Sequence, residues 1–344
     1  MVTKTWTRTD GPAARQHLAA EFHEHYRQSG VGRAGAVPVI SGADPTTLFI
    51  GSAISVLKQH VLTRQIPGRG IALAQPAVRA HNARRLLEPG FRFEWGGTFT
   101  NIAVLAPHHD PKALLAASLS FFTDRLQVAP ADLRIRATEH DQDLLGLSQS
   151  VGAHLVHEID RQPLRYYRHT IGLPHVTGRN INIALRIRDG FRDVGNFILF
   201  KDATDGYEFL EVGFGDTTIL RSLHNLPHVL DCFPFPEAPK QESPEQERLR
   251  RLREDCAAVA VILWREGLRP SSKNASTKIL GKYIRALHDS ARRSGADLSE
   301  VTQAVSQYEL LTHGDVQAAP ELTEYMHHKS ATLTRTIIDQ RGRP

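Results

Sequence analysis

The residues of this sequence that most clearly indicate a functional site surround an arginine, Arg79, at the end of an apolar stretch. Residues 70–79 read as a strand and end in Arg79, and residues 93–100, Phe-Glu-Trp-Gly-Gly-Thr-Phe-Thr, return after a turn rich in Arg, Asn, Pro and Gly. An arginine pairs two phosphate oxygens at once, and an aromatic ring beside bare glycine backbone lets a purine lie close. The pattern favours a hairpin that binds a nucleoside triphosphate. The alternative is an ordinary antiparallel hairpin with a surface salt bridge.

This hairpin resembles motif 2 of the class II aminoacyl-tRNA synthetases, and specifically that of alanyl-tRNA synthetase, where Phe-Glu-Met-Leu-Gly-Asn-Phe-Ser follows the arginine. Other segments resemble that family in the same order, spread with the hairpin over about residues 12–335. They are 44–49 (Asp-Pro-Thr-Thr-Leu-Phe), 195–200 (Gly-Asn-Phe-Ile-Leu-Phe), 210–215 (Leu-Glu-Val-Gly-Phe-Gly) and 266–272 (Glu-Gly-Leu-Arg-Pro-Ser-Ser). The resemblance implies a class II synthetase-type α+β domain, ATP-dependent activation of an amino acid with Mg²⁺, and a helical region of the kind that contacts tRNA.

In that family, ATP lies against motif 2 and the later glycine segment. Activation lets a carboxylate oxygen attack the α-phosphate, so cations must be placed where charge builds up. Arg79 matches the motif 2 arginine and is the catalytic candidate. The other candidates for binding ATP are His81, Glu94, Trp95, Phe99, Gly213 and Gly215. Structural alternatives stay open for these residues: a solvated turn for His81, for example, and simple sheet filling for Trp95.

The resemblance places the amino-acid pocket on the strands around 196–200 and 210–215, with Asn196, Ile198, Glu211 and Gly213 as its candidates. Glu211 stands where the family has the aspartate that binds the substrate ammonium group. One extra methylene shifts the carboxylate by roughly 1.5 Å. Ile198 replaces a smaller valine, which favours a small substrate. Both are also ordinary strand residues, which is the alternative.

Motif 3 of the family continues with an arginine that contacts the γ-phosphate, and Thr218 stands at that position here. Loss of a buried cation that pairs with phosphate costs about 2–5 kcal/mol. Arg221, three residues further on the same expected helix, is the candidate that replaces it. If it does not, ATP binding rests on Arg79, Mg²⁺ and the backbone, or the site does not use ATP. The family's Gly-Pro-Cys-Ser-Glu segment has also become Gly-Arg-Asn-Ile-Asn at 178–182.

Composition sets limits on the kind of protein. The 344 residues are 41% hydrophobic and 23% charged, with a formal net charge of +5. No apolar run approaches the roughly 20 residues of a membrane helix, and the N-terminus lacks a signal peptide's apolar core. We therefore expect a cytoplasmic protein. Only Cys232 and Cys256 are present, without zinc-type spacing, so neither a disulfide nor a metal held by the protein itself is expected.

The order of elements predicts a catalytic domain at 1–233, an exposed proline-rich linker at 234–244 and a helical domain at 245–344. We expect strands at 36–40, 47–50, 70–79, 91–104, 133–138, 181–187, 194–200 and 208–213. We expect helices at 12–29, 52–63, 111–126, 141–155 and 216–224, and then at 245–267, 276–294, 299–311 and 320–340. Several strands are joined by hairpins, so the first domain should be α+β with a mainly antiparallel sheet. Because the chain ends at Pro344, no editing domain is expected.

Three functions fit these observations. The first is an ATP-dependent ligase that activates a small amino acid, alanine above all, and passes it to a small-molecule acceptor such as a sulfamoyl nucleoside in natural-product biosynthesis. The second is a paralogue of alanyl-tRNA synthetase that charges tRNA. It is less favoured, because the helix after residue 272 carries about half the family's cations and phosphate contacts dominate such affinity. The third is a non-catalytic paralogue that binds an amino acid or a nucleotide.

Overall fold

The computed structural model describes residues 5–188 and 190–341, and it is built around one sheet. The strands are β1 (Gly32–Arg33), β2 (Ile71–Val78), β3 (Thr98–Pro107), β4 (Leu133–Thr138), β5 (Val156–Asp160), β6 (Arg168–Thr170), β7 (Val176–Ile187), β8 (Gly190–Asp202) and β9 (Glu208–Gly215). Their order is β1-β2-β3-β9-β8-β7-β4-β5, with β6 beside β7. Only β1–β2 and β4–β5 pair in parallel among these described strands. The prediction of an α+β fold with a mainly antiparallel sheet is confirmed.

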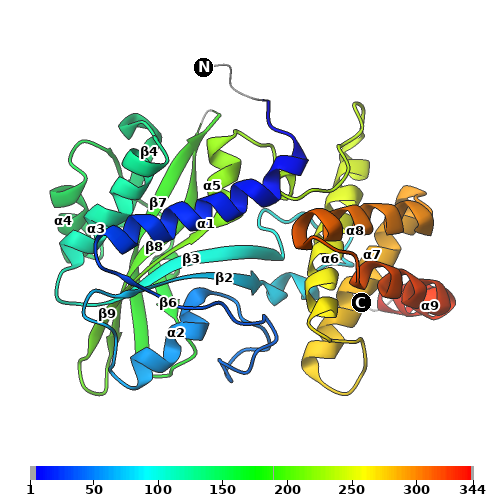
Figure 1. Ribbon diagram of the computed structural model, residues 1–344, viewed down its shortest axis with the longest axis horizontal. Helices are drawn as coiled ribbons and strands as arrows, with labels where there is room; N and C mark the ends of the chain where they lie inside the picture. Colours follow the sequence, from blue (N-terminus) through cyan, green and yellow to red (C-terminus); the bar gives the residue numbers. More distant parts are fainter. Residues whose placement is uncertain (1–4, 189, 342–344) are drawn as a thin grey trace.

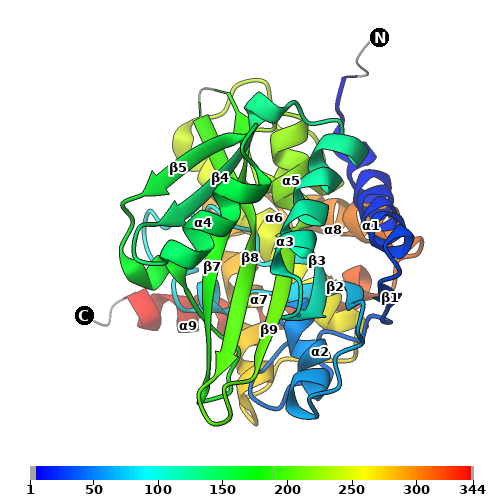
Figure 2. The same ribbon diagram turned by 90° about the vertical axis from the view of Figure 1, so that its left-hand side faces the viewer.

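Helices cover both faces of the sheet (Figures 1 and 2). One face packs against α1 (Gly11–Gln28), α3 (Pro111–Ser120), α4 (Gln142–Val151) and α5 (Asp216–Leu223). The other face packs at one end against α2 (Ala53–Leu62). The helical region follows with α6 (Pro244–Arg265), α7 (Ala275–Ser294), α8 (Leu298–His313) and α9 (Ala318–Arg341). In Figure 2 this region lies behind the strands.

Side-chain alternation gives the central strands one buried face and one open face. The buried face packs under α1, α3, α4 and α5, and its strand residues include Ile102, Val104, Phe197, Leu199, Val212 and Phe214. The residues between them in sequence point to the opposite face. Since α2 covers only one end of that face, the rest of it is available for a site.

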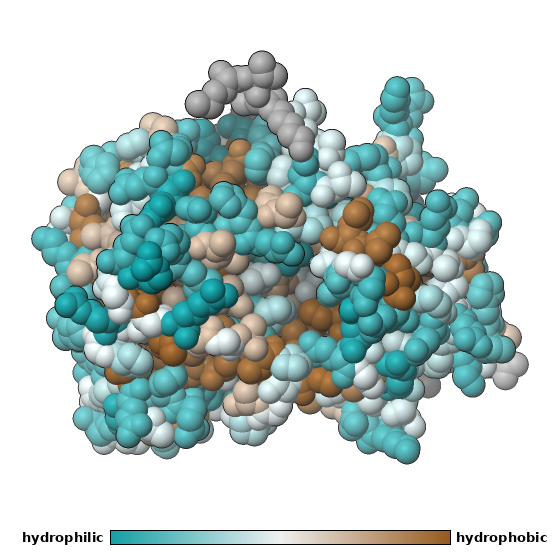
Figure 3. All heavy atoms as spheres, in the orientation of Figure 1, coloured by the Kyte–Doolittle hydropathy of each residue, from teal (hydrophilic) through white to brown (hydrophobic). Residues whose placement is uncertain are grey.

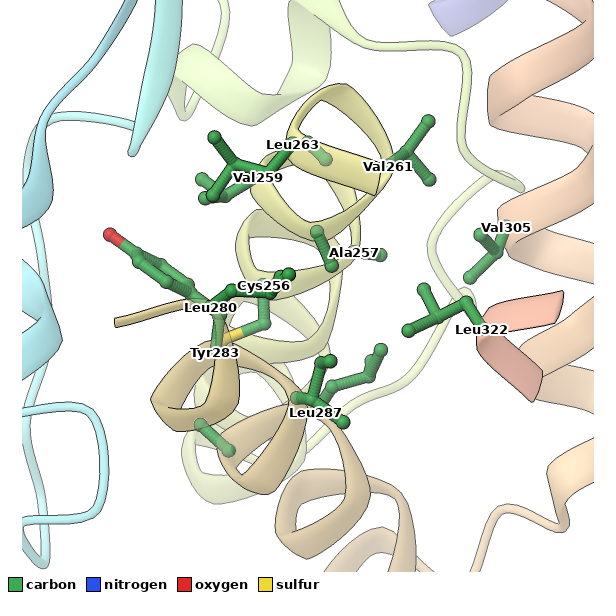
Figure 4. Packing of buried hydrophobic residues seen from close by; sticks show 14 of the residues in the cluster. Cys256, Ala257, Val259, Val261, Leu263, Leu280, Tyr283, Leu287, Val305 and Leu322 are labelled. Carbon is green, nitrogen blue, oxygen red and sulfur yellow. The ribbon is translucent and has the colours of Figure 1, made fainter. Parts of the chain in front are cut away.

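The helical region shares a hydrophobic core with the loop after β2. One cluster contains apolar side chains of α6 to α9 together with Val78, Ala83, Leu86 and Phe91. Figure 4 shows its centre, where Cys256, Val259 and Leu263 of α6 face Leu280 and Leu287 of α7. Ser243 caps the start of α6 by accepting a hydrogen bond from the backbone N–H of Gln246 at 3.2 Å. The helical region is therefore packed directly on the segment that follows Arg79.

The structure differs from the sequence prediction at several elements. The segments 36–40 and 47–50, expected as strands, are loops, and the strand expected from residue 91 begins only at Thr98. The short strands β1, β5 and β6 were not predicted. The start of the linker is not exposed, because Phe235 is buried and stacks on Tyr308 with ring centroids 4.7 Å apart. The domain boundaries stay a prediction, and their outer ends at residues 1–4 and 342–344 lie outside the described residues.

The surface of the described residues is mixed in character. On the face drawn in Figure 3, hydrophilic residues cover most of both ends and hydrophobic residues gather toward the middle. No helix in the described ranges has the length and apolar character needed to cross a membrane.

Candidate functional site

A cavity of about 540 Å³ lies on the open face of the sheet, beside the loop that follows β2. It brings together most of the residues that the sequence predicts for the site: Arg79, His81, Trp95, Phe99, Asn196, Ile198, Glu211, Gly213 and Gly215. The two groups of candidates, one for ATP and one for the amino acid, therefore line the same space. The roles assigned to them remain predictions.

Strand register explains why the residues around Glu211 meet. Gly213 and Glu211 of β9 lie directly opposite Asn196 and Ile198 of β8. On its other side, β9 pairs with β3, where Gly215 lies opposite Asn101. Because residues two apart on a strand point to the same face, these side chains share the open face. A run of alternating strand residues is thus enough to build this part of the cavity.

Arg79 is a cation without an anionic partner. Its guanidinium stacks 3.9 Å from the centroid of the Phe99 ring and 5.7 Å from that of Trp95. Within the described part of the chain it makes neither a hydrogen bond nor an ion pair. Burial lowers the pKa of Arg79 to about 10, against the opposing charges of Asp216 and Asp255. The side chain is still charged at neutral pH, and rings hold it without occupying its hydrogen-bond donors.

Glu211 is the complementary case, a carboxylate without a cation. It is 6% exposed, and its carboxyl group has no hydrogen bond or ion pair with the described residues. Burial alone raises the pKa of Glu211 to about 7. An ammonium group of a ligand would restore the lost solvation and favour the ionised form. The carboxyl group is therefore suited to bind a cation that enters the cavity.

The two charged groups are separated along the strands. Arg79 stacks on Phe99, which lies near the Gly215 end of β9, whereas Glu211 lies four residues before Gly215 on the same strand. Four residues of antiparallel strand span about 13 Å. The cavity therefore offers an anion site and a cation site at different positions, which suits a ligand pair that carries phosphates and an ammonium group.

Two predicted residues do not line the cavity. Arg221 donates hydrogen bonds from Nη2 to the carbonyl oxygen of Pro227 at 3.0 Å and from Nε to that of Leu226 at 3.3 Å. The expectation that Arg221 supplies the missing motif 3 charge is corrected by this arrangement, because carbonyls just beyond its own helix occupy the guanidinium. Glu94 pairs with Arg192 on the surface at 2.5 Å, so the structure does not place it beside Arg79 or a purine.

Thr218 lines the cavity at the position of the family's arginine, but its hydroxyl is occupied. It donates to the carbonyl oxygen of Gly215 at 2.7 Å. Arg79 is therefore the one cation among the described residues lining the cavity, apart from histidines.

Several lining or neighbouring residues escaped the sequence analysis. Asn101 fixes the cavity wall, since it donates to the carbonyl of Phe214 at 2.9 Å and accepts from the N–H of Ala53 at 2.8 Å. Its position two residues after Phe99 on the same face was a usable signal. Asp216 directly follows the second glycine; it is fully buried and pairs with Arg15 at 2.6 Å.

A polar wall of the cavity comes from the 3-10 turn Leu164–Tyr167 and from β6, β7 and β8. It contains Tyr166, His169, Thr170, Asn182 and Asp193. The hydroxyl of Tyr166 donates to Asp193 at 2.9 Å, and Arg136 pairs with the same carboxylate at 2.8 Å. Burial lowers the pKa of His169, so the imidazole is neutral at pH 7. No local sequence pattern marks these residues, because tertiary packing alone brings them to the cavity.

Metal binding by the protein alone is not indicated. In the described parts of the chain, no three His, Cys, Asp or Glu side chains are grouped so as to hold an ion. Asp193 and Glu211 are the carboxylates that line the cavity, and Asp193 is already paired. Mg²⁺ usually reaches such sites on nucleotide phosphates with one or two carboxylates as protein ligands. Since Asp193 is paired, Glu211 is the unpaired carboxylate among the described lining residues, and Mg²⁺ would be held mainly by the phosphates of a nucleotide.

Comparison with known proteins adds the following findings. No family model matches the chain, and no curated protein matches its sequence. Similar solved structures include aspartyl-tRNA synthetase from Entamoeba histolytica, with a TM-score of 0.40 and 11% identity over 67% of this chain. The match covers 59% of that protein, less than two thirds of its length.

Two asparaginyl-tRNA synthetases give comparable matches. For the enzyme from Entamoeba histolytica the TM-score is 0.41 at 8% identity, covering 69% of this chain and 68% of that one. For the enzyme from Pyrococcus horikoshii, solved with asparaginyl-adenylate, it is 0.39 at 10% identity, covering 68% and 70%. Similarity at this level does not indicate what the cavity binds.

Proposed function

We propose that this chain activates a small amino acid with ATP and transfers the aminoacyl group to a small-molecule acceptor. Alanine is the first candidate for the amino acid, and a nitrogen of a sulfamoyl nucleoside in natural-product biosynthesis is the first for the acceptor. The observation that carries the proposal is one cavity with two unpaired charges, the Arg79 guanidinium and the Glu211 carboxyl group. The resemblance of both segments to the alanyl-tRNA synthetase motifs supports it.

The first step joins the amino acid to AMP. Glu211 binds the ammonium group, so the substrate carboxylate points along β9 toward Arg79. A carboxylate oxygen attacks the α-phosphorus, and the bond to the bridging oxygen breaks, so that pyrophosphate leaves. Mg²⁺ bound to the phosphates would supply further neutralisation of their charge. Arg79 stabilises the negative charge that develops on the phosphate oxygens. Ile198, buried beside Glu211, limits the room for the amino-acid side chain.

The second step uses the acceptor. Its nitrogen or oxygen attacks the carbonyl carbon, the bond from that carbon to AMP breaks, and the acceptor proton passes to a base or to water. The polar wall around Asn182 and Asp193 lines the same cavity as Arg79 and Glu211.

Amino-acid-dependent exchange of pyrophosphate into ATP tests the first step. Alanine should support exchange more strongly than larger amino acids. Labelled alanine should then pass to an added small-molecule amine and not to tRNA. No exchange with any proteinogenic amino acid would refute the proposal, and transfer to tRNA would replace its second half.

One observation favours a second candidate, a protein that binds an amino acid and a nucleotide without reaction. Thr218 and Arg221 leave the cavity with a single permanent cation, where the family has a further one for the γ-phosphate. Calorimetric binding of ATP together with a complete absence of exchange would support this candidate over the ligase.

A further inference from the structure

Helices far along the chain hold the backbone that carries Arg79. The hydroxyl of Tyr283 on α7 donates to the carbonyl oxygen of Arg79 at 3.1 Å, across 204 residues of sequence. Figure 4 shows this side chain projecting from the helical cluster, with its hydroxyl directed away from the other labelled residues. The Tyr283 ring is fully buried. Because its ring is packed in the core, Tyr283 holds its hydroxyl in one place, and the hydrogen bond to Arg79 therefore restrains the loop.

A second contact that fixes the Arg79 backbone comes from α6. The N–H of Arg79 donates to the carbonyl of Gly97 at 2.8 Å, and the N–H of Gly97 donates to Asp255 at 2.5 Å. Asp255 is fully buried, and its other carboxylate oxygen has no hydrogen-bond partner in the described structure. The two contacts therefore fix both the carbonyl oxygen and the N–H of Arg79.

Gly97 allows α6 to approach this closely. A methyl group at that position would lie 2.7 Å from a methyl carbon of Val259 and 3.0 Å from Asp255. The glycine pair of the hairpin thus has a use beyond any ligand: it lets α6 dock on the loop.

We propose that Tyr283 and Asp255 are positioning residues for phosphate binding, through which α6 and α7 fix Arg79 at the cavity. The inference deepens the proposed function and rests on it for the identity of the anion. The Arg79 side chain has no anchoring hydrogen bond of its own in the described chain, so its backbone, together with the rings of Phe99 and Trp95, defines where the guanidinium reaches. The helical region is then part of the activation site as well as a platform for an acceptor.

A double-mutant cycle on the full chain tests this assignment, with Mg·ATP affinity measured by calorimetry. Tyr283→Phe removes only the hydroxyl and should weaken ATP binding about tenfold, because a displaced cation loses its geometry. In an Arg79→Ala background the same change should cause no further loss. Tyr308→Phe removes a hydroxyl from another buried tyrosine of the helical region and should leave affinity unchanged in both backgrounds. Asp255→Asn keeps an acceptor for Gly97 and should retain more affinity than Asp255→Ala.

Equal losses from Tyr283→Phe in the two backgrounds would overturn the inference, since the hydroxyl would then act on stability in general. Full ATP affinity in Tyr283→Phe, or a wild-type chain that binds no ATP, would also overturn it. The proposed function fails separately: a wild type that binds ATP and shows the expected cycle, but exchanges no pyrophosphate, would refute the ligase and leave the positioning role intact.

Discussion

Glu211 and Arg79 line the same cavity, but the structure holds them by different means. Glu211 lies within a strand, and pairing with the two neighbouring strands fixes its position. Arg79 follows the last residue of its strand. Its N–H donates a hydrogen bond to the carbonyl oxygen of Gly97, and its carbonyl oxygen accepts one from the distant Tyr283. Register is encoded locally, residue by residue, whereas a loop needs tertiary contacts to stay in place. The charge on the strand is therefore expected to be robust and the charge on the loop to depend on remote residues.

The largest expected effect is at the loop. Arg79→Ala removes the unpaired cation and should reduce pyrophosphate exchange by about 30- to several-thousand-fold, the range for losing a charge that pairs with phosphate. Steady-state exchange at saturating alanine measures it. Arg84→Ala is the matched control, because Arg84 lies in the same segment but is exposed and does not line the cavity. Similar losses in both variants would mean that overall charge, and not this site, drives nucleotide binding.

This difference also separates what the sequence predicted from what it did not. Glu211, Gly213, Asn196 and Ile198 were expected from the resemblance, on two strands predicted at 194–200 and 208–213, and the structure brings them together. The contacts by which Tyr283 and Asp255 hold the backbone around Arg79 could not be predicted from the sequence. Asp255 reads as one polar position on an amphipathic helix, and it meets Gly97 across 158 residues.

The errors have local physical reasons. Residues 36–40 were predicted as a strand because they are mostly apolar, and Val39 is indeed buried. However, the carboxylate of Glu266 accepts hydrogen bonds from the backbone N–H groups of Val39 and Ile40 at 2.9 Å. The Glu266 side chain thus replaces the backbone hydrogen bonds that a neighbouring strand would supply. Arg221 was expected in the cavity from helical spacing alone. Spacing gives the face of a helix but not the competition from free carbonyls beyond its end.

The strand end of the cavity yields an intermediate effect that depends on pH. Glu211→Gln should raise the KM for the amino acid about 30-fold or more, because the ammonium group loses a charged partner.

Without ligand, the Glu211→Gln variant should be more stable than the wild type. Burial raises the pKa of Glu211 to about 7 from an ordinary 4.5, so the folded state binds the proton more tightly than the unfolded state. Stability contributed by this group is therefore lost as pH rises from about 4.5 to 7, by up to about 3 kcal/mol.

Urea unfolding at pH 5 and pH 8 measures this penalty. Glu211→Gln should gain up to about 3 kcal/mol at pH 8 and about 1 kcal/mol at pH 5. Glu208→Gln is the control, since Glu208 lies on the same strand but pairs with His108 and Lys201 and does not line the cavity. A variant that is less stable than wild type at pH 8 would show that Glu211 already has a favourable partner.

The smallest effect concerns the size of the amino-acid pocket. Ile198→Val removes one methylene from a side chain that lies beside Glu211 and packs against the α2 cluster. The substitution should cost about 1 kcal/mol of stability. It should also shift the ratio of kcat/KM toward an amino acid one methylene larger than alanine, by about tenfold, since a pocket discriminates single methylenes weakly. Ile183→Val, the same change on the buried face of the sheet, should cost similar stability without altering the ratio. Equal shifts in the kcat/KM ratio from both variants would mean that packing of the whole sheet sets selectivity. The position of Ile198 on its strand would then not determine the size of the pocket by itself.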